Sequence, residues 1–222
     1  MEASTFDQEL ADLKATILKM GILVQELIFK SVEALKTRDR NLAKSVIKMD
    51  MEVDRLELVV DEKCINLIAL RQPKASDLRF ITTGIRIATD LERVGDLAED
   101  IAERAIELSE QPLLKPLIDI PRMAILAEQA VAYSLDAFVG RDVKKAKAIW
   151  QIEKEVDHLR DLVHDELLSI MSKDPTTISR AIPLLLVSRH LERISDHATN
   201  IAEDVVYMVE GKVVKHHPDQ LE

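Results

Sequence analysis

Apolar residues recur along the chain at the three- and four-residue spacing of an amphipathic helix. One uninterrupted stripe of this kind runs between residues 42 and 67. Its members are Leu42, Val46, Met49, Val53, Leu56, Val60 and Leu67. Aromatic residues make up only 3% of the chain, and Ala, Leu, Ile, Glu, Lys and Arg dominate, as is typical of helical proteins. The pattern predicts an all-α protein.

Helix-starting and helix-breaking residues divide this pattern into six long helices. Asp39 and Asp142 each follow a tight turn and are good N-caps. Pro73 and Pro175 break the next connections, with Ser76 or Thr176 as candidate caps for the third and sixth helices. Pro183 predicts either a kink in the last helix or a later start for it. The predicted helices cover residues 6–36, 39–71, 76–109, 119–139, 142–172 and 176–210.

The six helices fall into two homologous halves on either side of a proline-rich linker, "SEQPLLKPLIDIPR". The stretch "DLERVGDLAEDIAER" at 90–104 returns as "HLERISDHATNIAED" at 190–204, and the stretches near 38–62 and 141–166 share their RD, A-K, EVD and D-E positions. Short loops make neighbouring helices antiparallel. We therefore predict two tandem three-helix up-down bundles, one in residues 1–110 and one in 117–212.

Carboxylates form stripes beside the apolar seams in equivalent places of both halves. A spacing of four residues puts two side chains one turn apart on the same helix face. Stripes of small residues next to the acids, for example Gly95 and Ser195, would let the preceding helix approach closely. Four pairs at this spacing stand out: Asp50 with Asp54, Glu92 with Asp96, Glu153 with Asp157, and Glu192 with Asp196.

If the second and third helices of each half pack together, two pairs meet and form an all-oxygen site. Carboxylates at that range repel one another unless they are protonated, paired with cations or bridged by a metal ion. Hard or borderline cations such as Fe, Mn, Mg or Ca suit such ligands, and Zn is compatible. The alternative is a metal-independent helical scaffold with solvated acids, some of them neutralised by Arg93 and Arg193 in surface ion pairs.

Charge and composition exclude several classes of function. The formal net charge of −10 is a poor match to nucleic acid or to an anionic membrane surface. No glycine-rich phosphate loop occurs, and no nucleophile constellation suggests an enzyme. The N-terminal residues do not resemble a signal peptide, and no apolar run is long enough to span a membrane. These features favour a cytoplasmic protein.

The doubled motif and the stretch "QPKASDLRFI" at 72–81 resemble the PhoU family of phosphate-transport regulators over essentially the whole chain. The resemblance implies that the paired E(D)xxxD motifs hold multinuclear metal clusters, with iron or zinc, on the bundle surface. It also suggests Asp100 and Asn200 as additional ligands, one turn beyond Asp96 and Asp196. Because Asn200 is neutral where the first repeat has Asp100, the two sites are expected to differ in occupancy or metal.

The same resemblance implies regulation rather than catalysis. Proteins of this family restrain the phosphate-starvation response when phosphate is plentiful. The resemblance implies a link between the ATP-binding subunit of the high-affinity phosphate ABC importer and a membrane sensor histidine kinase, and it implies a homodimer. A related alternative is an accessory protein of a low-affinity phosphate permease.

A ferritin-like di-metal enzyme is a further alternative, because such enzymes place carboxylates on bundle helices. Their sites need a Glu-x-x-His motif from each of two helices, projecting into the core. Glu155 and His158 have that spacing, but the first repeat has Glu52 and Arg55 at the equivalent positions. The motif is therefore not repeated, and the sequence disfavours this alternative.

Overall fold

The computed structural model describes residues 5–214, and within this range the chain is helical, with no strand. The helices are α1 (Thr5–Thr37), α2 (Arg40–Arg71), α3 (Ala75–Ser109), α4 (Asp119–Gly140), α5 (Val143–Lys173) and α6 (Ile178–Glu210), with a short 3-10 turn, η1 (Pro175–Thr177). The predicted all-α fold of six long helices is confirmed, and every boundary lies within two residues of its prediction. No helix in residues 5–214 is long and apolar enough to cross a membrane.

Aspartate side chains start the second helix of each repeat, as predicted. Asp39 Oδ1 accepts hydrogen bonds from the backbone N–H groups of Asn41 and Leu42, at 2.9 and 3.0 Å. Asp142 caps α5 in the same way. These bonds satisfy backbone donors that the first turn of a helix leaves free.

The starts of α3 and α6 differ from the expected capping. Ser76 lies inside the first turn of α3, and no side chain caps that helix. Before α6 the cap is Asp174, whose carboxylate accepts hydrogen bonds from the backbone N–H and the hydroxyl of Thr176. Residues 175–177 form the 3-10 turn, so α6 starts at Ile178 and continues through the buried Pro183.

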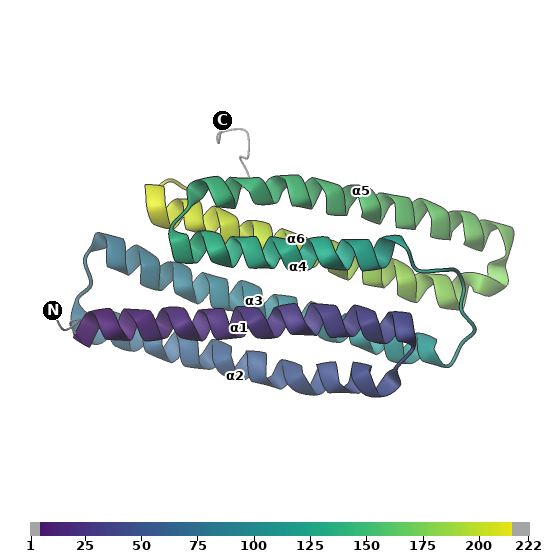
Figure 1. The fold of residues 1–222 in the computed structure, drawn as a ribbon, viewed down its shortest axis with the longest axis horizontal. Helices are drawn as coiled ribbons and strands as arrows, with labels where there is room; N and C mark the ends of the chain where they lie inside the picture. The colour runs from purple at the N-terminus through teal and green to yellow at the C-terminus, as the bar shows by residue number, and fades with distance from the viewer. Residues whose placement is uncertain (1–4, 215–222) are drawn as a thin grey trace.

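Each repeat is an up-down-up bundle, and the two bundles lie side by side (Figure 1). The helices α1 and α3 of the first repeat pack against α4 and α6 of the second. The helices α2 and α5 lie at opposite outer edges (Figure 1). As a result α2 contacts only α1 and α3 closely, and α5 contacts only α4, α6 and η1. Each outer helix therefore presents a long face to solvent.

The interface between the repeats is a packed apolar core. The rings of Phe80 on α3 and Phe138 on α4 stack with centroids 5.1 Å apart, and Phe138 is fully buried. Gly21 on α1 leaves room for the side chain of Leu135 on α4, which an added Cβ would meet at 2.1 Å. The two bundles are thus joined by interdigitated side chains as well as by the linker.

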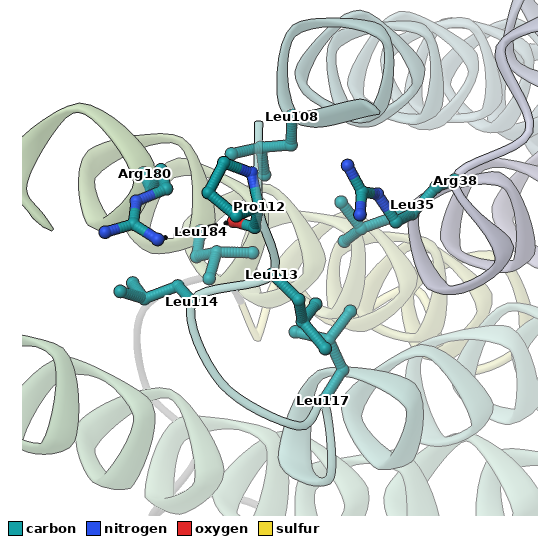
Figure 2. Close-up of a pocket in the computed structure, with 9 residues that line it drawn as sticks. All are labelled: Leu35, Arg38, Leu108, Pro112, Leu113, Leu114, Leu117, Arg180 and Leu184. Atoms are coloured by element: carbon teal, nitrogen blue, oxygen red, sulfur yellow. Dashed lines mark hydrogen bonds between the residues drawn. The ribbon is translucent and has the colours of Figure 1, made fainter. Parts of the chain in front are cut away.

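The linker between α3 and α4 is held by arginines around a small apolar void (Figure 2). Arg38 donates to the carbonyl oxygens of Ser109, at 2.8 Å, and Gln111. Arg180 donates to the carbonyl of Pro112. The void measures about 20 Å³ and is lined largely by leucines, which leaves space for about one water molecule.

Candidate metal centre

The close approach of α2 to α3 depends on a glycine. A Cβ added at Gly95 would meet Asp50 Oδ1 at 2.3 Å and the Val53 side chain at 3.3 Å. The predicted role of the small residues on α3 is therefore confirmed at this position. Because Gly95 has no side chain, Asp50 lies against the backbone of α3 and is only 3% exposed.

Asp50, Asp54 and Asp96 converge between α2 and α3. One carboxylate oxygen from each of the three lies within 4.8 Å of the other two. Asp50 is buried, Asp96 is half-buried and Asp54 is exposed, so the group opens to solvent on one side. Two of the predicted i,i+4 pairs, Asp50 with Asp54 and Glu92 with Asp96, thus meet at one helix–helix junction.

The electrostatics of this first cluster favour the binding of a cation. Burial raises the pKa of Asp50 to about 7, and repulsion by Asp54, Glu99 and Asp96 adds to the effect. Burial also raises the pKa of Glu92, with Asp96 contributing further. Asp50 Oδ1 is buried and has no hydrogen-bond partner in residues 5–214. A bound cation would offset the repulsion among the carboxylates and would give Asp50 Oδ1 a partner.

The nearest positive charge in this cluster is Arg93. Its guanidinium lies 2.9 Å from Asp96 Oδ2 and 3.3 Å from Glu92 Oε2. The Arg93 side chain is 56% exposed, so water screens this ion pair and its contribution to stability is small. Arg93 therefore balances the outer rim of the cluster, whereas Asp50 forms a hydrogen bond with the side chain of Glu99.

The second repeat brings Glu153, Asp157, Glu192 and Asp196 to the corresponding α5–α6 junction, but with an arginine among them. Arg160 Nη1 lies 3.2 Å from Glu192 Oε1, and Arg160 Nη2 lies 3.7 Å from Asp157 Oδ1. Burial raises the pKa of Glu153 and of Asp196. Among residues 5–214 no second group of three carboxylates meets as closely as the first. The second cluster is thus partly neutralised by the protein itself.

Asp100 and Asn200 lie at the interface between the repeats, where α3 packs on α6. Asp100 Oδ2 is 3.7 Å from His190 Nδ1. Asn200 Nδ2 donates to Asp90 Oδ1 at 3.3 Å, and the same oxygen lies 2.8 Å from His197 Nδ1. The structure therefore pairs both residues across the repeats and does not bring them into the group formed by Asp50, Asp54 and Asp96.

Three residues outside the predicted ligand set also shape the two clusters. Glu99 contributes to the raised pKa of Asp50, and burial raises the pKa of Glu57, which lies close to Thr89. At the position equivalent to Glu57 the second repeat has Arg160. Aligning the two repeats position by position would have revealed this change of charge.

The Glu-x-x-His pair that suggested a ferritin-like site does not have the geometry of one. Glu155 and His158 are both exposed on α5, and Glu155 pairs with Arg122 of α4. Neither side chain projects into a bundle core, which such a site requires.

The chain is thus an all-α protein built from two three-helix repeats, each with carboxylates between its second and third helices. The family model "PhoU domain" matches it twice, over residues 17–105 and 120–205. The chain belongs to the PhoU family.

Its relatives resemble it over almost their whole length. A "Phosphate-specific transport system accessory protein PhoU homolog" from Aquifex aeolicus (strain VF5) is 44% identical over 209 residues, which cover 94% of this chain and 95% of that protein. The protein of the same description from Pseudomonas aeruginosa is 38% identical over 212 residues, which cover 95% of this chain and 88% of that protein.

Two solved structures share the fold. The crystal structure of PhoU from Pseudomonas aeruginosa has a TM-score of 0.90 and 38% identity, with 94% of this chain and all of that chain covered. The phosphate transport system regulatory protein PhoU from Streptococcus pneumoniae has a TM-score of 0.89 and 31% identity, with 95% of this chain and all of that chain covered. The arrangement of both repeats is therefore that of the family.

Proposed function

We propose that this protein is an accessory regulator of a phosphate-specific transport system. It restrains the phosphate-starvation response as a cytoplasmic adaptor and acts by binding rather than by catalysis. Its partners are the ATP-binding subunit of the high-affinity phosphate ABC importer and a sensor histidine kinase, and it works as a homodimer. The names of its relatives support the accessory and regulatory role, since they are described as accessory and regulatory proteins of phosphate transport.

The first carboxylate cluster is the observation that carries the metal-binding part of the proposal. Asp50, Asp54, Glu92 and Asp96 supply only oxygen ligands, which suits hard and borderline cations. The buried, unpartnered Oδ1 of Asp50 points to a missing positive partner. We propose that these residues hold iron or zinc and that the metal bridges α2 and α3. Glu153, Asp157, Glu192 and Asp196 form a second, weaker site, because Arg160 must first release Glu192.

Metal analysis of matched double variants tests this assignment. We expect Asp54→Ala/Glu92→Ala to remove most of the iron or zinc that copurifies with untagged protein, because it takes one ligand from each helix of the first cluster. The equivalent Asp157→Ala/Glu192→Ala is expected to remove a smaller share. Elemental analysis measures both. If the wild-type protein holds no metal even after soaking with iron, manganese or zinc, the metal assignment is wrong.

An adaptor also needs an exposed surface for its partners, and α2 provides an apolar ridge. Met51, Leu58 and Ile65 lie seven residues apart on its outer face and are 69%, 67% and 61% exposed. Side chains at this spacing form one continuous stripe on a helix. The equivalent positions of α5 hold Lys154, Asp161 and Leu168. Such an exposed apolar stripe is typical of a protein–protein contact.

Leu58→Asp tests whether this ridge is needed for regulation. We expect the variant to fold normally, because the second repeat already has an aspartate at the equivalent position, Asp161. In cells that lack the native protein, a phosphate-starvation reporter should stay switched on in phosphate-rich medium with the variant and be repressed with the wild type. The exposed Leu113→Asp, in the linker, is the control. Full repression by Leu58→Asp would show that partners bind elsewhere.

A further inference from the structure

The second repeat has an open cleft between α5 and α6, with a volume of about 690 Å³. Its lining residues are Arg160, His164, Leu185, Leu186, Ser188, Arg189, Glu192, Arg193 and Asp196. The lining thus contains three arginines and one histidine but only two carboxylates. In a protein with a net charge of −10, this is a local reversal of sign.

The equivalent surface of the first repeat has the opposite balance. Its positions are Glu57, Asp61, Ile85, Arg86, Ala88, Thr89, Glu92, Arg93 and Asp96, so two arginines stand against four carboxylates. The changes from Glu57 to Arg160, from Asp61 to His164 and from Thr89 to Arg189 account for most of the difference. Two equivalent surfaces of the repeats therefore carry opposite balances of charge.

Arg160 has a second effect, because it competes for the carboxylate that would otherwise bind Arg193. In the first repeat Arg93 pairs with Glu92 and Asp96. In the second repeat Glu192 pairs with Arg160, at 3.2 Å. Arg189 and Arg193 are exposed, and they act on Glu192 and Asp196 through charge alone, with no close ion pair to either carboxylate in residues 5–214. Their guanidinium groups are left available in the cleft.

Arg189 and Arg193 lie four residues apart on α6, so their side chains project from the same face one turn apart. A guanidinium presents a planar fork of N–H donors that matches two oxygens of a phosphate or carboxylate. Two such forks suit an anion that carries several oxygens and two charges. Arg160 pairs with Glu192, Asp157 and Asp161, which reduces their repulsion of an anion. Asp196 is the remaining carboxylate of the cleft lining.

We propose that the α5–α6 cleft binds a phosphate group through Arg189 and Arg193, either as inorganic phosphate or at the end of a small phosphorylated molecule. The volume of the cleft exceeds that of a free phosphate ion and is typical of small-molecule sites. Phosphate binding by these arginines needs neither a bound metal nor a protein partner. It can therefore be tested independently of the adaptor function.

Isothermal titration of the full-length protein with inorganic phosphate, and separately with ATP, tests the proposal. Metal is first removed with a chelator, and ionic strength is kept low because salt screens exposed charges. We expect one site per chain, weakened at least about tenfold in Arg189→Gln/Arg193→Gln, since the double variant loses both charge-assisted contacts to the anion. The control is Arg93→Gln in the first repeat, which should bind as the wild type does. Tighter binding of ATP assigns the site to a phosphorylated molecule, and tighter binding of phosphate assigns it to the free ion.

Three outcomes would overturn the proposal. The first is the absence of binding by either probe at millimolar concentration. The second is unchanged affinity in the double variant, provided that its circular dichroism spectrum matches the wild type. The third is binding that returns only when metal is added and is lost in Asp157→Ala/Glu192→Ala, because a metal and not the arginines would then hold the anion.

Discussion

Replacing Asp50 with asparagine is expected to stabilise the metal-free protein at pH 8. The pKa of Asp50 is 3.8 in its ordinary state and about 7 in the fold, chiefly because the side chain is buried. Between these values the folded protein holds a proton that the unfolded chain has lost, so the free energy of unfolding falls as pH rises. Once both states are ionised, the cost is on the order of 4 kcal/mol. Asparagine keeps the shape and removes the charge.

Chemical denaturation across pH measures this effect in the presence of a chelator. The wild-type protein should lose stability from about pH 4 to about pH 7, whereas Asp50→Asn should change less, so that the gap is widest at pH 8. Asp165→Asn, at a side chain that is 84% exposed, is the control and should change stability little. With iron or zinc added the order should reverse, because a bound ligand stabilises the folded state and the variant lacks one ligand. A variant no more stable than wild type at pH 8 would show that Asp50 is not a strained anion.

Phe138→Ala is expected to lower the free energy of unfolding by about 3–5 kcal/mol, the usual cost of emptying an aromatic site in a core. Phe138 is fully buried and stacks on Phe80 across the two repeats. The loss therefore affects the junction between the bundles more than either bundle alone. Phe29→Ala is the control, because Phe29 is 58% exposed and its removal should cost much less.

Denaturant unfolding followed by circular dichroism measures both variants, and the shape of the curve tests the predicted division into residues 1–110 and 117–212. A single transition would show that the repeats unfold together through their shared interface. Two transitions would show that each three-helix unit is stable by itself. A loss below about 1 kcal/mol in Phe138→Ala would mean that the junction repacks around the missing ring.

The helices could be predicted closely from the sequence because their signals are local. Asp39 and Asp142 cap their helices through bonds to backbone groups two and three residues away. The 3-10 turn before α6 differs from the prediction because Asp174, and not Thr176, takes the capping role. The meeting of Asp50 with Asp96 could also be predicted, since Gly95 and the repeated acids indicate a close approach of α2 to α3.

The positions of Asp100 and Asn200 could not be read from spacing alone. A step of four residues rotates a side chain by about 40° around the helix axis. Two steps from Glu92 therefore carry Asp100 about 80° away from the face that meets α2 and toward α6. Only the packing of α3 against α6 decides that Asp100 lies beside His190 and Asn200 beside Asp90.

The linker at residues 110–118 joins the two repeats in one chain and so allows them to differ in sequence. If two identical three-helix chains formed this six-helix body as a homodimer, any substitution would occur twice, and both clefts would have to remain alike. Joining the halves in one polypeptide removes that constraint. Glu57 and Arg160 are the visible result, because the same place in the two repeats now has opposite charge. Each half is then free to change the charge of its own surface without changing that of the other.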